Sequence, residues 1–248
     1  MNEAKSSAAE PLVEIDGLSG LGFESIAMTL RAGEIVGVAG IAGSGKATFA
    51  ETLVGLRPAR AGTVRVEGRV LSHGVRNARD AGIGFIPRDR HRDGLVLDLS
   101  IEENATMTID DRLGPLGWID PRKRRNAGAK AITQLAIVAK SSSQPVSELS
   151  GGNQQKVVFA RALAREPKIL VAMDPTAGVD VKSKEALAAQ IVRLRESGTA
   201  IVIVSDDLDD LRSCDRVMVF FAGRVAAEFS GGWRDNDLVA SMEGLGVA

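Results

Sequence analysis

Gly40-Ile41-Ala42-Gly43-Ser44-Gly45-Lys46 lies between a short apolar run at residues 34–39 and a stretch at about 45–56 that we expect to be helical. Strand, glycine loop and helix in that order form the setting that a phosphate-binding loop requires. The glycines let successive backbone N–H groups turn inward around phosphate oxygens, and Lys46 adds a point charge. This setting disfavours the alternative, a glycine turn with a solvated lysine. The stretch therefore predicts an α/β core with a phosphate site after one of its strands.

The rest of the chain alternates between expected strands and expected helices. Strands are expected at 63–69, 83–86, 168–173 and 199–205, with a closing pair at 217–221 and 225–229. Helices are expected at 121–138, at 182–196 and at the end of the chain. This alternation predicts a mainly parallel sheet that is covered on both faces.

Composition limits the class of protein. With 248 residues, 44% of them hydrophobic, the chain suits one large α/β domain, with or without a small inserted lobe. A net charge of −1 favours neither nucleic acid nor an acidic membrane surface as the main partner. The single Cys214 excludes an internal disulfide and fits a reducing cytoplasm. Residues 1–11 predict a tail or a cut linker, no signal peptide is expected, and the apolar runs are too short to span a bilayer.

A second glycine motif, Leu149-Ser150-Gly151-Gly152-Asn153-Gln154-Gln155, opens an expected helix that continues to Leu163. The free N–H groups and the positive dipole end of such a helix suit a terminal phosphate. An ordinary serine cap on a core helix is the simpler interpretation of the same residues. The motif by itself leaves both interpretations open.

Together, these motifs resemble the ATP-binding domains of ABC transporters over nearly all of residues 12–248. The sharpest matches are residues 31–38, 87–96, 149–155 and 175–181, besides the loop at 40–46. The combination is similar to the second nucleotide-binding domain of the tandem ATP-binding proteins of bacterial sugar importers, the ribose/galactose/xylose type. This resemblance implies a P-loop NTPase core with a mainly parallel sheet, an N-terminal antiparallel β portion and a helical signature lobe at about 98–165. Because that family holds both domains in one chain, this chain is either a separately encoded half or a fragment.

The resemblance also assigns roles to residues. It implies phosphate contacts from the P-loop residues Gly40, Gly43, Ser44, Gly45, Lys46, Ala47 and Thr48. It implies that the signature residues act on a nucleotide held by another domain, and these are Leu149, Ser150, Gly151, Gly152, Asn153 and Gln154. Asp180 falls in the D-loop, which follows the Walker B strand.

The positions that handle Mg²⁺ depart from the family pattern. Ala47 stands where the family places a Ser or Thr ligand, and we expect Thr48, about 100° further round the helix, not to replace it. Met173 occupies the position of the metal-supporting acid, and Asp174 that of the general base, one methylene shorter than the usual Glu. If the register slips by one residue, Asp174 serves the metal and the base is missing. No residue is therefore assigned as a metal ligand.

Two further positions differ from the family. Asp206 stands at the position of the switch histidine, and Pro87 at that of the Q-loop glutamine. His73 and His91 are expected on the surface rather than in catalysis. Phe23 is the nearest candidate to stack on adenine, although core packing is the better interpretation for it.

The resemblance implies an ATP-binding subunit of a bacterial carbohydrate importer, at the inner face of the cell membrane and on its cytoplasmic side. Its cofactors would be ATP and a weakly bound or lost Mg²⁺, with slow or absent hydrolysis at its own site. The alternative is a non-hydrolysing module that closes a partner's site. The implied partners are a second ATP-binding domain, favoured to be a different chain, a membrane permease and, indirectly, a periplasmic or lipoprotein sugar-binding protein. The basic runs at 88–92 and 122–125 indicate solvated faces or permease docking, and not nucleic acid.

Overall fold

The central strand of the molecule is β3 (Ile35–Ala39), whose five residues are all buried. The computed structural model describes residues 11–245, so the tail predicted at 1–11 lies almost wholly outside the described residues. The main sheet has the order β10-β9-β3-β8-β7-β6, with β6 at Ile83–Ile86, β7 at Ile169–Met173, β8 at Ala200–Val204, β9 at Arg216–Phe221 and β10 at Arg224–Ser230. All neighbours from β6 to β9 are parallel and only β10 runs antiparallel, which confirms the expected sheet.

Two hydrophobic cores lie on opposite faces of this sheet. Successive side chains of a strand point to opposite faces. Ile35 accordingly belongs to one core and Val36 to the other. The first core includes residues of α6 (Gly151–Leu163) and α7 (Val181–Glu196). The second includes residues of α1 (Lys46–Leu53). Burial on both faces explains why the central strands are continuous apolar runs.

A smaller antiparallel sheet covers the second core. Its order is β2-β1-β4-β5, with β1 at Val13–Gly20, β2 at Phe23–Leu30, β4 at Ala61–Val66 and β5 at Arg69–Val70. In β2 and β4, buried residues largely alternate with exposed ones, as expected for strands with one face on a core. This sheet is the antiparallel N-terminal portion that the resemblance implied.

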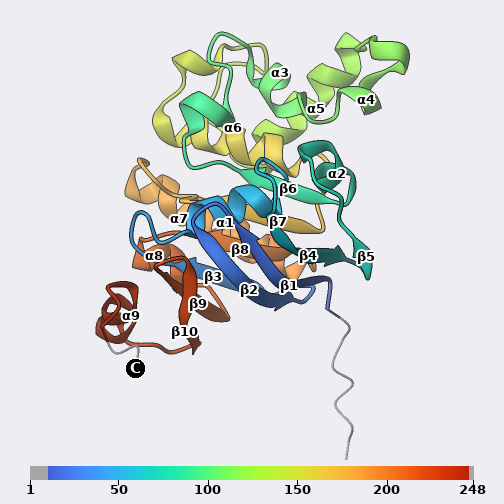
Figure 1. Ribbon diagram of the computed structural model, residues 1–248. Coiled ribbons are helices and arrows are strands. Elements are labelled where there is room, and N and C mark those ends of the chain that lie inside the picture. The colour runs from blue at the N-terminus through green and yellow to red at the C-terminus, as the bar shows by residue number, and fades with distance from the viewer. Residues whose placement is uncertain (1–10, 246–248) are drawn as a thin grey trace, which may run out of the picture.

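A helical lobe forms the upper part of the molecule in Figure 1. It contains α3 (Ile101–Thr106), α4 (Asp110–Leu113), η2 (Pro115–Gly117), α5 (Pro121–Gln134), η3 (Val146–Glu148) and α6. The remaining helices are α2 (Val75–Asp80), the π-helix η1 (Arg90–Gly94), α8 (Leu208–Leu211) and α9 (Asp235–Met242). Between residues 11 and 245, every helix is too short or too polar to cross a membrane.

Three expected elements differ in extent. The strand predicted at 63–69 is a hairpin, because Glu67 and Gly68 both have positive φ, the backbone of a tight two-residue turn. The helix predicted at 121–138 ends at Gln134, and Ala136 turns into the left-handed region. The helix predicted at 45–56 ends at Leu53, with Gly55 left-handed two residues later.

Candidate functional site

The phosphate-binding loop connects β3 to α1 and depends on glycine. Gly40, Gly43 and Gly45 all have positive φ. A Cβ on Gly45 would overlap the carbonyl oxygen of Gly22, and one on Gly40 would overlap that of Phe220. Helix α1 begins directly after Gly45 with no side-chain cap, so its first N–H groups remain available at the loop. The sequence folds here into a backbone cradle that suits an anion.

Two side chains equip this loop for phosphate. Lys46 is buried, and its Nζ donates a hydrogen bond to the carbonyl oxygen of Gly40 and lies 3.5 Å from Asp206 Oδ2. Ser44 is also buried, and its Oγ has no hydrogen-bond partner within residues 11–245. A buried hydroxyl without a partner is costly. The free hydroxyl, the backbone cradle and the lysine together fit the phosphate groups of a nucleotide.

The first turn of α1 offers no free hydroxyl beside the loop. Ala47 is half-buried and lines the same cleft as Met173, so the two positions expected to support a metal ion do face one space. Thr48 donates its hydroxyl to the carbonyl oxygen of Gly45 at 2.9 Å, which commits it to the helix backbone. Neither Ala47 nor Met173 carries a side-chain oxygen, and Pro87 adds none. These three positions therefore supply none of the side-chain oxygens that Mg²⁺ prefers as ligands.

Asp174 lies at the end of β7 in an unusual environment. Its φ of 43° is left-handed, and its side chain is buried. Oδ2 lies 2.8 Å from Arg88 Nε, whereas the buried Oδ1 has no hydrogen-bond partner among the described residues. Desolvation raises the pKa of Asp174, and the positive charge of Arg88 opposes that rise. Across residues 11–245, no three His, Cys, Asp or Glu side chains gather as metal ligands would.

The signature segment starts α6 with an open N-terminus. Leu149 is buried, and Ser150 is exposed at the N-cap position. Ser150 Oγ accepts a hydrogen bond from Asn153 Nδ2 at 3.0 Å and makes no capping bond to the backbone. Gly152 packs so closely on Ser183 that a Cβ would overlap its hydroxyl. The serine does not cap the helix, so the first N–H groups of α6 stay available to a ligand from outside.

Hydrogen bonds tie this signature helix to the segment after β7. Gln155 Nε2 donates to the carbonyl oxygen of Pro175 at 2.8 Å, and Gln154 Oε1 lies 3.0 Å from His91 Nε2. Arg90 donates to the carbonyl oxygens of Ala177 and Gly178 at 2.9 and 3.3 Å. These bonds join the loop after β6, the signature helix and the segment after β7 into one unit.

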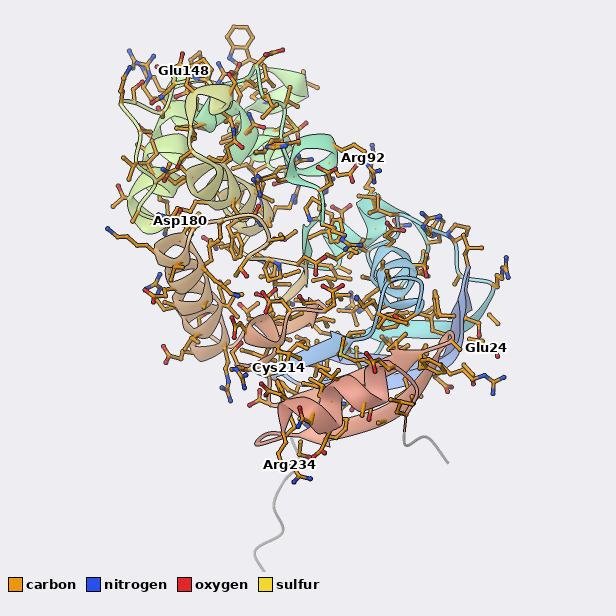
Figure 2. The ribbon with its side chains drawn as sticks, turned by 90° about the vertical axis from the view of Figure 1, so that its left-hand side faces the viewer. Glu24, Arg92, Glu148, Asp180, Cys214 and Arg234 are labelled. Carbon is orange, nitrogen blue, oxygen red and sulfur yellow. The ribbon has the colours of Figure 1, made fainter. Side chains whose placement is uncertain are left out.

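The start of α7 completes this unit. Asp180 accepts hydrogen bonds from the backbone N–H and the hydroxyl of Ser183, at 2.9 and 2.7 Å, and these bonds lower its pKa. Figure 2 shows Asp180 at the end of α7 that faces the helical lobe.

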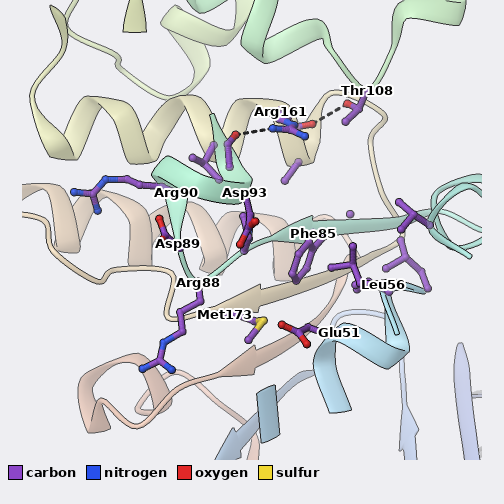
Figure 3. Close-up of a pocket in the computed structure, with 18 of the residues that line it drawn as sticks. Glu51, Leu56, Phe85, Arg88, Asp89, Arg90, Asp93, Thr108, Arg161 and Met173 are labelled. Atoms are coloured by element: carbon purple, nitrogen blue, oxygen red, sulfur yellow. Dashed lines mark hydrogen bonds between the residues drawn. The ribbon is translucent and has the colours of Figure 1, made fainter. Parts of the chain in front are cut away.

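A cleft of about 1330 Å³ opens beside the phosphate loop, between α1, α2, η1 and α6. Figure 3 shows Met173 and Glu51 at its floor and η1 with Arg90 and Asp93 above them. Arg161 of α6 donates to the carbonyl oxygen of Gly94 at 2.7 Å and fixes η1 against the lobe.

The arrangement matches that of a known family. The model of the family described as "ABC transporter" matches residues 23–177, which is more than half of the chain. The chain belongs to the ABC transporter family of ATP-binding domains. Solved ABC domains share its fold. A nucleotide-free ATP-binding cassette superposes with a TM-score of 0.80, at 19% identity over 93% of this chain and 96% of that one. A dimeric ATP-binding cassette in a post-hydrolysis state with ADP and phosphate superposes with a TM-score of 0.77. It is 23% identical over 88% of this chain and 98% of that one.

Curated relatives of this ABC domain include proteins named ribose import ATP-binding protein. The one from Chromobacterium violaceum is 40% identical over 241 residues, which is 96% of this chain and 47% of the relative. The one from Geobacillus kaustophilus is 42% identical over 207 residues, or 83% and 42%. The chain thus spans less than half the length of these relatives.

The structure places several residues that the sequence singled out. Asp206 is exposed and pairs with the P-loop lysine. His73 and His91 are exposed, as expected. Phe23 is buried in the core in edge-to-face contact with Phe49, so it is not placed to stack on adenine. Sequence patterns did not distinguish Arg88 from the rest of the basic run at 88–92, which was interpreted as a solvated face or a docking surface.

Proposed function

We propose that this ABC domain is the ATP-binding subunit of a bacterial sugar importer, and that its two nucleotide-contacting surfaces have different tasks. Its P-loop binds ATP with little or no Mg²⁺-dependent hydrolysis, and its signature segment completes the site of a second ATP-binding domain. The observation that carries the proposal is the contrast between an intact phosphate cradle with an open α6 N-terminus and the oxygen-free side chains of Ala47, Met173 and Pro87.

Binding at the P-loop follows from its residues. A phosphate oxygen would take up the Ser44 hydroxyl and the loop N–H groups, and Lys46 would exchange the Gly40 carbonyl for the phosphate. In the family, Mg²⁺ supplies positive charge that assists phosphoryl transfer. In this chain the side chains at the expected ligand positions carry no oxygen. Asp174 is a poor general base because it is held by Arg88 at 2.8 Å. Loss of a general base typically costs about 10²–10⁴ in rate.

The signature segment remains able to act on a partner's nucleotide. Ser150 and the first turn of α6 present a hydroxyl and free N–H groups at a positive helix end. A homodimer would join two sites that both lack side-chain oxygens at the metal positions, so the partner that we propose is a different ATP-binding domain. The relatives named for ribose import are each more than twice as long as the matched part, which supports a place as one part of a longer arrangement. The altered metal positions favour the second domain of such a tandem.

The domain works on the membrane through a permease. We propose that residues 12–248 form one ATP-binding domain with its helical lobe at about 98–165, on the cytoplasmic face of the cell membrane. The cleft beside the P-loop would receive a cytoplasmic segment of the permease. A sugar-binding protein outside the membrane would act only through that permease. A non-hydrolysing regulatory module of the same complex is the alternative, and it would bind ATP at the same site.

Replacement of Lys46 tests the phosphate site. Lys46→Ala removes a charged donor, and hydrogen bonds to charged groups contribute about 1.5–3 kcal/mol. We expect ATP affinity to fall about 10- to 100-fold in equilibrium dialysis of the purified chain. Lys168→Ala is the matched control, because Lys168 is exposed and pairs with Glu67 far from the loop. Equal affinities of the Lys46 variant and the unaltered chain would rule out nucleotide binding at this loop.

A further inference from the structure

The P-loop end of the site holds four charged side chains as two ion pairs. Lys46 Nζ lies 3.5 Å from Asp206 Oδ2, and Arg88 Nε lies 2.8 Å from Asp174 Oδ2. Asp174 is close enough to sense the charges of Lys46 and Asp206 as well as that of Arg88. The four groups are therefore one electrostatic cluster. Its charges cancel in the absence of a ligand.

Arg88 is held by one edge of its guanidinium. Its Nε faces Asp174, whereas Nη1 and Nη2 make no hydrogen bond within the part of the chain that the structure describes. Its side chain is 56% exposed, although its partner Asp174 is buried. Arginine presents a planar fork of donors that matches phosphate oxygens, and it keeps its charge at any physiological pH. The carboxylate thus orients a fork whose other donors remain free.

The neighbouring basic residues are already committed. Arg90 donates to the carbonyl oxygens of Ala177 and Gly178, and Arg92 pairs with Asp93 on the same turn. Figure 3 shows Arg88 beside Met173 at the end of β7, while Arg90 points away along η1. Within the basic run, Arg88 is thus the residue beside the position that lacks a metal-supporting acid.

We propose that Arg88 takes the place of the divalent cation, so that the site binds a metal-free nucleoside triphosphate through the free donors of this guanidinium. The inference rests on the proposed function and deepens it. Lys46 and the loop N–H groups hold the phosphates that ATP and ADP share, and Arg88, oriented by Asp174, bonds to the terminal phosphate that ADP lacks. Asp174 is in this arrangement a positioning residue and not a base. The site then distinguishes ATP from ADP without a metal ion.

The test measures ATP and ADP affinities in EDTA by calorimetry. For Arg88→Gln we expect ATP affinity to fall about 10- to 100-fold, the effect of a charge-assisted hydrogen bond, with ADP affinity changed less than about twofold. Arg88→Lys keeps the charge but loses the planar fork of donors, so its preference for ATP over ADP should lie between that of the unaltered chain and that of Arg88→Gln. Arg92→Gln is the matched control and should bind as the unaltered chain does, because the Arg92 side chain is exposed and, within the described residues, bonds only to Asp93.

The outcomes separate the inference from the proposed function. Unchanged ATP affinity in Arg88→Gln, or an equal loss for ATP and ADP, would overturn the role of Arg88 and leave nucleotide binding intact. Failure of the unaltered chain to bind either nucleotide would overturn both. If Arg88→Gln melts well below the unaltered chain, Arg88→Lys decides: an undiminished ATP-to-ADP preference in that variant rejects the guanidinium as the discriminating group.

Discussion

Ser150→Arg is expected to abolish ATP-driven transport by the assembled importer and to leave ATP binding by the isolated chain unchanged. Ser150 is exposed at the N-terminus of α6, and among residues 11–245 its hydroxyl bonds only to Asn153, so the fold tolerates a longer side chain there. An arginine would block the helix end from a partner's terminal phosphate. Loss of one such stabilising element costs about 10²–10³ in rate. The measurements are transport into vesicles and calorimetry of the isolated chain.

A matched control guards against a trivial loss of folding. Ser143→Arg places the same side chain on another exposed position of the helical lobe and should transport as the unaltered importer does. If Ser150→Arg weakened ATP binding by the isolated chain itself, the signature segment would act within its own site. Its role on a partner's nucleotide would then be wrong.

The second large effect that we expect is a gain in ATP turnover. The triple change Ala47→Ser, Met173→Asp and Asp174→Glu restores the hydroxyl and the two acids at the positions where the family has them. Ala47 and Met173 line one cleft, so the new oxygens would face a common space. We expect Mg²⁺-dependent ATP turnover to rise about 100-fold or more, in line with the usual contribution of a general base. The measurement is phosphate release at saturating ATP.

Two controls define what the gain means. Ala47→Ser alone should stay near the basal rate, and adding Lys46→Ala to the triple variant should abolish the gain. Met173 is buried, so the folded fraction of each variant must be checked by circular dichroism. If the folded triple variant shows no gain in ATP turnover, then the backbone at Asp174, with its left-handed φ, prevents hydrolysis. The missing side chains would then not be the cause.

The pattern of apolar runs and glycines predicted the core of this fold because both have local causes. Strands buried on both faces leave continuous apolar runs, as in β7 and β8. The ends of elements were less predictable. The Glu67-Gly68 turn places a non-glycine residue at positive φ, which sequence patterns do not favour, so the hairpin looked like one strand. Ala136 ends α5 early in the same way.

The candidate site was predictable where a motif carries it and not where a long-range contact does. The phosphate cradle is formed by consecutive residues 40–46, so its glycines predicted it from the sequence. The pair of Arg88 with Asp174 joins the ends of two strands whose residues are far apart in sequence. The bond from Gln155 to Pro175 likewise depends on tertiary packing, because it joins helix α6 to the segment after β7. A net charge of −1 and a basic run did not indicate which arginine would pair with which acid.

The most direct measurement is the ATP affinity of the unaltered chain, titrated by calorimetry once with Mg²⁺ and once with EDTA. A site that binds phosphate through its loop, Lys46 and its own cations, with no oxygen ligands at Ala47 and Met173, should give affinities that agree within about threefold. An affinity more than about tenfold tighter with Mg²⁺, a difference of about 1.4 kcal/mol, would contradict a metal-independent site and return the chain to the metal-dependent ATPases.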